Sequence, residues 1–265
     1  MATGAVLAII GGGNMGGAMV QGLLRAGHAA SDLVIVETSA ERRAVLTKLF
    51  AGIHIAADTP RCDEAIIAVK PADVATACAR AVAAGARRVI SIAAGVRIAA
   101  IQAACGADVR VVRAMPNTPA VVGLSATAMA VSHTCDDADR TWARTLLQSI
   151  GIVVEIDEAM LDAFTGLIGS GPAYVFYVAE SLQAAAVAEG FDEATSAKLV
   201  AQLLVGAAAL LEREPQHARE LRQRVTSPNG TTAAGVAALS DHKTHDAFVA
   251  AVRAATQRSK ELGDA

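Results

Sequence analysis

Val6-Leu-Ala-Ile-Ile-Gly-Gly-Gly-Asn-Met-Gly16 decides the fold of this chain, because a short apolar run leads directly into the spacing Gly11-x-Gly13-x-x-Gly16. In such a strand–turn–helix unit, the first glycine permits the tight turn and the second lets the main chain approach a pyrophosphate. The third lets the helix pack on the strand. Since a helical pattern follows over Asn14–Ala26, free N–H groups at a helix N-terminus would face the phosphates. The motif therefore predicts a dinucleotide site, whereas the same glycines without this context would only mark a turn.

Short apolar runs alternate with helical stretches through the first part of the chain. This pattern is typical of a mainly parallel sheet covered by helices. The predicted strands are Val6–Ile10, Leu33–Glu37, Ala65–Val69, Arg88–Ile92, Val109–Arg113, Ala126–Val131 and Ile152–Glu155. We therefore expect an α/β chain whose N-terminal part, residues 1–157, is a Rossmann-type dinucleotide-binding domain.

Strand signals stop after Asp157, and the remaining sequence follows helical periodicity. We expect an all-α substrate and dimerisation domain over residues 158–265. Its predicted helices are Ala159–Gly169, Ala173–Glu189, Glu193–Arg213, Gln216–Val225, Thr231–Leu239 and Thr244–Leu262, with a break at Gly171-Pro172. In open α/β sheets ligands bind at the carboxyl ends of the strands, so we expect the active site there, facing the helical domain.

The composition argues against several function classes. The net charge of −3 leaves no basic footprint for nucleic acid or for an anionic membrane. No basic and apolar leader precedes the first strand, so we expect a cytoplasmic protein. The four cysteines, Cys62, Cys78, Cys105 and Cys135, form no CxxC pair. This spacing predicts reduced thiols, and we expect no metal site.

The stretch Leu199–Leu211 is apolar almost throughout and on every helical face. It is shorter than the roughly 20 residues of a membrane span, so we interpret it as a helix buried on all sides. A small helical domain can cover one apolar stripe, whereas a helix that is apolar all round needs cover on its far side as well. A second copy of the chain is the simplest cover, and we therefore expect a homodimer or an assembly of dimers.

The end of the second predicted strand bears on the choice of cofactor. An acid at this place, here Glu37, accepts hydrogen bonds from the adenosine ribose and repels a 2′-phosphate, which favours NADH. Ser39, Arg42 and Arg43 follow at once and offer a hydroxyl and cations to a 2′-phosphate. These residues are compatible with either NADH or NADPH.

Three further strand ends carry candidate cofactor contacts. Lys70 could reach a phosphate or the nicotinamide, and Pro71 follows it where a helix would begin. The small residues of Ser91–Val96 leave room for a flat ring. In Val112–Pro119, two prolines flank Asn117 and Thr118, which predicts a rigid polar loop without a general base. We interpret this loop as one that positions a ligand, and an ordinary turn is the alternative.

The segment Val225–Thr232 has the features of an anion seat. Its turn ends in the free N–H groups of a new helix, with the hydroxyls of Thr231 and Thr232 beside them. A small carboxylate would fit this seat. The alternative is a helix start that binds no ligand.

Six motifs together closely resemble those of pyrroline-5-carboxylate reductase, in the same order and over nearly the whole chain. They are Gly11–Gly16, Val69–Pro71, Ser91–Gly95, Val112–Ala120, Gly169–Tyr174 and Ser227–Thr232. The resemblance implies NAD(P)H-dependent reduction of 1-pyrroline-5-carboxylate to L-proline, the last step of proline biosynthesis. It also implies a helical domain that interleaves with that of a partner chain.

The resemblance also implies roles for individual residues. The N–H groups of Gly230 and Thr231 hold the substrate carboxylate, Asn229 completes the seat, and the Thr232 hydroxyl contacts the ring nitrogen as the catalytic residue. We assign cofactor contacts to Gly11, Gly13, Asn14, Met15, Glu37, Ser39, Val69, Lys70, Pro71, Ala93, Met115, Pro116 and Asn117. NADPH is the expected cofactor and NADH the alternative.

Two positions depart from the pattern of the family. Asn229 replaces a glycine, and asparagine tolerates a positive φ better than other residues with a side chain. Gln223-Arg224 stands where family members often carry an acid.

Two other functions compete with this interpretation. The β-hydroxyacid dehydrogenases share the glycine pattern, but they use a lysine four residues beyond a Gly-Ser-Gly-like turn, where this chain has Val175. A non-catalytic NADPH-sensing protein would have a damaged substrate seat, whereas this seat is nearly complete. The sequence therefore favours the reductase.

Overall fold

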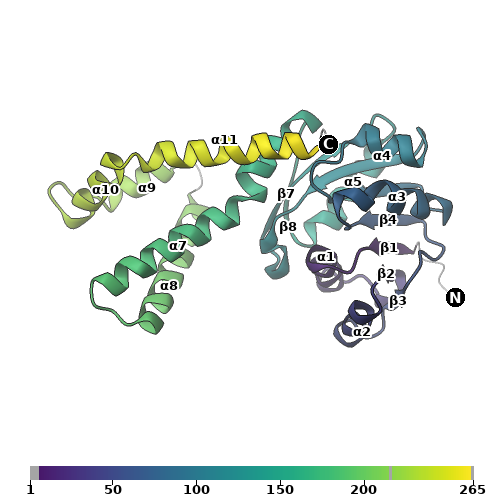
Figure 1. The fold of residues 1–265 in the computed structure, drawn as a ribbon, viewed down its shortest axis with the longest axis horizontal. Coiled ribbons are helices and arrows are strands. Elements are labelled where there is room, and N and C mark those ends of the chain that lie inside the picture. The colour runs from purple at the N-terminus through teal and green to yellow at the C-terminus, as the bar shows by residue number, and fades with distance from the viewer. Residues whose placement is uncertain (1–5, 215–216, 264–265) are drawn as a thin grey trace. The chain divides into compact units, whose positions relative to one another are not determined.

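The computed structural model describes residues 6–214 and 217–263. By its internal contacts the chain forms two units, the first made of residues 1–170 and 254–265 and the second of residues 171–253 (Figure 1). The described part of the first unit holds a sheet with helices, and that of the second unit is helical. An α/β part followed by a helical part confirms the predicted fold class.

The sheet has eight strands in the order β3-β2-β1-β4-β5-β6-β7-β8. Their bounds are Leu7–Ile10 (β1), Leu33–Val36 (β2), His54–Ala56 (β3), Glu64–Ile67 (β4), Arg88–Ser91 (β5), Arg110–Met115 (β6), Ser125–Val131 (β7) and Gly151–Glu155 (β8). Neighbouring strands are parallel except β6 and β7, which are antiparallel. The mainly parallel sheet is therefore confirmed.

Strand β3 has no counterpart among the strands predicted from the sequence. This strand has only three residues, too few for a periodic pattern, and none of them is buried. It pairs with β2, from Val34 opposite His54 to Val36 opposite Ala56. As a result, the residues after Ala56 lie at the carboxyl edge of the sheet, where the sequence predicted none.

Helices cover both faces of the sheet. They are Asn14–Arg25 (α1), Ala40–Leu49 (α2), Val74–Ala83 (α3), Ile98–Cys105 (α4), Asp137–Gln148 (α5) and Leu161–Phe164 (α6). Ile9 of β1 packs in one core with α1, α2 and α5, whereas its neighbours Ala8 and Ile10 pack in a second core with α3, α4 and α6. Alternate side chains of one strand thus enter opposite cores, as expected for a strand buried on both faces.

One predicted helix, Ala159–Gly169, is wrong as a continuous helix. The chain instead forms a 3₁₀ turn over Glu158–Met160, the short helix α6 and a π-helical turn over Thr165–Gly169. In the π turn the N–H of Ser170 donates to the carbonyl of Thr165 at 2.8 Å. A helix passes into this wider turn when the usual i to i+4 bonds are interrupted.

The remaining helices lie close to their predicted positions. They are Gly171–Ala188 (α7), Glu193–Arg213 (α8), Ala218–Arg224 (α9), Thr231–Asp241 (α10) and Thr244–Gly263 (α11). Gln216, where the helix before Val225 was predicted to begin, lies outside the described residues. The last turns of α11 belong to the first unit, in which Ser259 donates a hydrogen bond to Asp162 at 2.7 Å.

Helix α8 differs from its prediction in burial. In the single chain only Ser196 and Val200 of this helix are buried, and Leu199, Leu203 and Val205 are more than half exposed. The cover that the sequence analysis expected on the far side of this helix is therefore not supplied by the chain itself. By length and composition α8 is also the one helix among the described residues that could cross a membrane. The apolar stretch Leu199–Leu211 is shorter than a membrane span, but the whole helix has 21 residues.

Candidate functional site

Close approach of main chain shapes the turn after β1. Gly11 has a φ of +108°, and a Cβ atom built on it would lie 2.5 Å from the carbonyl oxygen of Ala68. A Cβ on Gly16 would collide with the carbonyl oxygen of Gly11. Gly13, in contrast, has no atom within 4 Å of such a Cβ and faces open space. The turn is therefore tight at its two ends and accessible in the middle, which suits a pyrophosphate at the start of α1.

A hollow of about 530 Å³ opens beside this turn. It lies at the carboxyl ends of β1, β2 and β4, where the strand order reverses direction, and such a switch point is the usual ligand site of an open α/β sheet. Five of the predicted cofactor residues line it: Gly11, Gly13, Glu37, Val69 and Lys70. The structure thus brings these residues together on three neighbouring strand ends.

Four more candidates adjoin the hollow along the chain. Asn14 and Met15 begin α1, Ser39 is the N-cap of α2, and Pro71 opens a 3₁₀ turn directly after Lys70. Ala93, Met115, Pro116 and Asn117 do not line the hollow. Instead they lie at or just after the ends of β5 and β6, farther along the same edge of the sheet.

Several residues that line the hollow are not among the predicted cofactor contacts. Asp58 and Thr59 follow the unpredicted strand β3, and Thr76 and Arg80 come from α3. Residues four apart on a helix share one face, so the spacing of Thr76 and Arg80 is a signal that could have identified them. The sequence carries no such signal for Asp58 and Thr59, because their place at the sheet edge depends on the unpredicted strand β3.

The Glu37 carboxylate forms hydrogen bonds at the rim of this hollow. One oxygen accepts from the N–H of Gly12 at 3.1 Å and the other from the N–H of Ser39 at 2.9 Å. The acid thereby joins the glycine turn to the start of α2. It also places a negative charge next to the turn that is expected to bind phosphate.

The two arginines that follow Glu37 are partly engaged with main chain. Arg42 donates from Nε to the carbonyl of Gly12 at 2.7 Å. Arg43 donates from Nη1 to the carbonyls of Glu37 and Thr38 at 2.9 and 2.8 Å. Both guanidinium groups therefore lie beside residues of the glycine turn and the end of β2, with further N–H groups left to donate.

The loop after β6 is held by Asn117, which is 8% exposed. Its Nδ2 donates to the carbonyl of Ile168 at 3.1 Å, and its Oδ1 accepts from the N–H of Ala126 at 3.1 Å. The N–H of Asn117 donates to Ser125 Oγ at 3.2 Å. The predicted rigid loop is therefore present, and hydrogen bonds of its asparagine contribute to the rigidity.

The predicted substrate seat lies in the second unit, at the start of α10. Asn229 has a φ of +62°, so it adopts the left-handed conformation that asparagine tolerates. Gly230 is the N-cap of α10 and no side chain caps the helix. The N–H groups of its first turn therefore lack partners within the helix. Among the described residues, the exposed hydroxyls of Thr231 and Thr232 have no hydrogen-bond partner. The seat therefore offers a ligand both main-chain N–H groups and side-chain hydroxyl groups.

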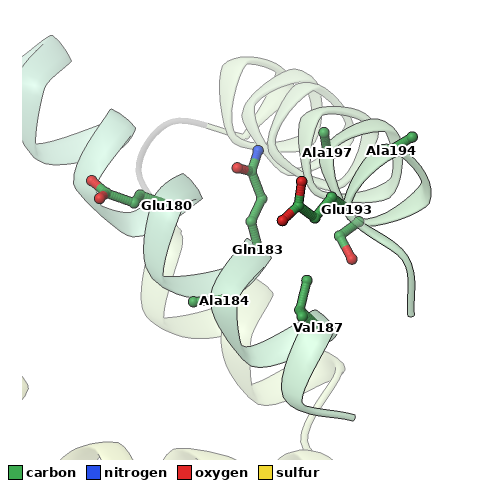
Figure 2. A pocket seen from close by; sticks show the side chains of 8 residues that line it. Glu180, Gln183, Ala184, Val187, Glu193, Ala194 and Ala197 are labelled. Atoms are coloured by element: carbon green, nitrogen blue, oxygen red, sulfur yellow. The ribbon is translucent and has the colours of Figure 1, made fainter. Parts of the chain in front are cut away.

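A larger hollow of about 740 Å³ lies elsewhere, along α7 and α8 of the second unit (Figure 2). Its polar side chains are those of Glu180, Gln183, Glu193 and Ser196. None of the predicted site residues lines it. We base the candidate site on the smaller hollow, because it coincides with the glycine turn and the switch point of the sheet. Among the described residues, no group of three His, Cys, Asp or Glu side chains could hold a metal ion.

Family models match both parts of the chain. Residues 6–95 match the model "NADP oxidoreductase coenzyme F420-dependent", and residues 158–262 match "Pyrroline-5-carboxylate reductase dimerisation". The second match begins at the 3₁₀ turn before α6 and ends within α11.

Similar proteins match over nearly their full length. A curated pyrroline-5-carboxylate reductase of Synechocystis is 38% identical, with 97% of this chain and 98% of the relative covered. A solved pyrroline-5-carboxylate reductase of Coxiella burnetii has a TM-score of 0.89 at 32% identity, with 97% and 98% of the two chains covered. The Plasmodium falciparum pyrroline carboxylate reductase, solved with NADP bound, has a TM-score of 0.87 at 27% identity, with coverage of 99% and 100%.

The position of Glu37 leads to a prediction about dinucleotide choice. Glu37→Gln removes a negative charge beside the expected 2′-phosphate, so the affinity for NADPH relative to NADH should rise about fivefold or more. Glu41→Gln, an exposed acid on the first turn of α2, is the matched control and should leave the ratio unchanged. Titration of protein fluorescence with each dinucleotide measures the ratio. An unchanged ratio in Glu37→Gln would mean that this carboxylate does not face the ribose.

Proposed function

We infer that this chain, which belongs to the pyrroline-5-carboxylate reductase family, reduces 1-pyrroline-5-carboxylate to L-proline with NADPH. The observation that carries this function is the donor seat at the start of α10, in a chain that also has a dinucleotide hollow at its sheet switch point. The β-hydroxyacid dehydrogenase alternative needs a lysine where Val175 stands, and the sensor alternative needs a damaged seat. Neither condition is met.

The residues supply what reduction of a cyclic imine requires. When bound, NADPH supplies a hydride to the imine carbon. Gly230 and Thr231 hold the substrate carboxylate through their N–H groups, and the Thr232 hydroxyl contacts the ring nitrogen. A threonine hydroxyl is far too weak an acid to protonate the imine. The nitrogen is therefore already protonated, and the Thr232 hydroxyl oxygen accepts a hydrogen bond from its N–H and orients the ring. Rate enhancement then comes mainly from positioning.

The cofactor contacts follow the strand ends. Gly11, Gly13, Asn14 and Met15 bind the pyrophosphate at the start of α1, and Glu37 and Ser39 lie beside the adenosine ribose. Val69, Lys70 and Pro71 extend the site along β4. The nicotinamide lies toward Ala93, Met115, Pro116 and Asn117, at the ends of β5 and β6.

The helical part forms a homodimer. We assign residues 158–265 to the dimerisation domain and residues 1–157 to the dinucleotide-binding domain. By their internal contacts, residues 158–170 and 254–265 belong to the first unit. Large apolar side chains of the second unit are exposed in the single chain, among them Phe176, Tyr177 and Leu203. Many large apolar side chains left exposed in this way are typical of an interface. We place the dimer in the cytoplasm, as expected for an enzyme of amino-acid biosynthesis.

A steady-state assay tests the function directly. Purified protein is given 1-pyrroline-5-carboxylate with NADPH or NADH, and in parallel 3-hydroxyisobutyrate with NADP⁺. We expect dinucleotide oxidation with the imine only. Turnover of the hydroxyacid without turnover of the imine would contradict the proposal.

Thr232 provides a residue-level prediction. Thr232→Ala removes the only side-chain hydroxyl assigned to the ring nitrogen, so kcat should fall about 10- to 1,000-fold. Thr232→Ser keeps the hydroxyl and should retain most of the activity. The dissociation constant of NADPH should stay unchanged in both variants. Wild-type kcat in Thr232→Ala would exclude this role for the hydroxyl.

The exposed apolar surface predicts the assembly state. A monomer would leave this surface in water, so association should persist to low concentration. Sedimentation velocity at micromolar protein should show a dimer or an assembly of dimers. A folded, active monomer would contradict the proposed interface.

A further inference from the structure

Asn117 is the residue whose contacts the proposed reaction leaves unexplained. Its side-chain amide is buried and has one partner at each end, the carbonyl of Ile168 for Nδ2 and the N–H of Ala126 for Oδ1. Only an amide in this orientation satisfies both partners, because a carbonyl needs a donor and an N–H needs an acceptor. The two partners lie on different elements, the π turn and β7.

The carbonyl of Ile168 accepts a hydrogen bond from outside its helix. In an α-helix it would accept from the N–H four residues on, but that residue is Pro172, which has no N–H. The amide of Asn117 supplies a donor in its place. The motif Val112–Ala120 is thus joined by one hydrogen bond of 3.1 Å to Ile168, the residue directly before the motif Gly169–Tyr174.

A second contact joins the same two elements. The methyl group of Met115 lies so close to Gly169 that a Cβ built on Gly169 would be 3.0 Å from it. Met115 ends β6, and Asn117 follows it by two residues. The loop after β6 is therefore fixed to the π turn on both sides of Pro116.

We propose that Asn117 is a positioning residue for hydride transfer: its amide fixes the loop after β6 to the π turn, and so sets the positions of Met115 and Pro116 beside the nicotinamide. This inference rests on the proposed function. Asn117 acts through these neighbours, since both ends of its amide are occupied by protein groups. The pyrophosphate turn at Gly11–Gly16 is on a different strand end and does not depend on this bond.

The substitution Asn117→Asp separates positioning from mere folding. An ionised carboxylate still accepts from the N–H of Ala126 but presents an oxygen to the carbonyl of Ile168. When the carboxyl group is protonated, its O–H can donate to that carbonyl and restore the bond. Burial raises the pKa of such a carboxyl group, which brings its titration toward the range of an assay.

The hydrogen bonds of Asn117 involve no ionisable side chain. Asn117 contacts the hydroxyl of Ser125 and main-chain groups of Ala126 and Ile168. The charged side chains of the flanking elements are paired with one another. Arg113 of β6 pairs with Glu158 and Asp162, and Arg110 at the far end of β6 pairs with Asp139.

The experiment measures kcat of Asn117→Asp relative to wild type from pH 8 to pH 6, with Asn117→Leu as the control that cannot regain the bond. At pH 8 both variants should lose about 10- to 100-fold in kcat, because misplacement by about 1 Å has this effect. As the pH falls, the ratio should rise for Asn117→Asp and stay flat for Asn117→Leu. The dissociation constant of NADPH should change little in either variant.

A double-mutant cycle with Pro172→Ala provides an independent test. Alanine restores an N–H that can donate to the carbonyl of Ile168, so the loss caused by Asn117→Leu should be at least about threefold smaller in the Pro172→Ala background. Wild-type kcat in Asn117→Asp at pH 8, a ratio that is flat with pH, or independent effects in the cycle would overturn the proposal. Failure of both position-117 variants to fold, judged by circular dichroism, would also overturn it in favour of a purely structural role. A wild type without turnover refutes the proposed function itself and is seen before any variant is measured.

Discussion

Main chain packs directly against main chain at the turn after β1, and the other parts of the first unit are arranged around this contact. The N–H of Gly11 donates to the carbonyl of Val36 on β2 at 2.8 Å, and the carbonyl of Ile10 accepts from the N–H of Ala68 after β4 at 2.7 Å. Side chains at Gly11 or Gly16 would push these strands and α1 apart. Because the three strand ends are held together, the hollow between them opens at one defined place.

The proposed reaction depends more on the positions of the dinucleotide and the imine than on reactive side chains. The proposed pyrophosphate and carboxylate seats both use N–H groups at helix starts, α1 in the first unit and α10 in the second. A protonated imine needs a hydride donor at the correct distance and no strong base. Rigid turns therefore matter more here than acidic side chains with shifted pKa values. Asn117 is the side chain that best shows how such a turn is held.

Much of the fold could be predicted because its signals are local. Seven strands are visible as apolar runs, and α8 begins and ends at its predicted residues. The strand β3 could not be predicted because three residues carry no period, and Asp58 and Thr59 were missed with it. The π turn was missed because it depends on Pro172 and on a donor more than fifty residues away in sequence, Asn117. The roles of Arg42 and Arg43 depend on main-chain carbonyls that a sequence does not display.

The central claim is that the dinucleotide hollow and the helical seat together serve hydride transfer to a cyclic imine carbon. Transfer of an isotope label measures this step most directly. The protein is incubated with 1-pyrroline-5-carboxylate and NADPH deuterated at the transferable C4 position, and the product is examined by mass spectrometry and NMR. The account predicts proline with one deuterium on the former imine carbon. Proline without deuterium, or deuterium at any other carbon, would contradict it.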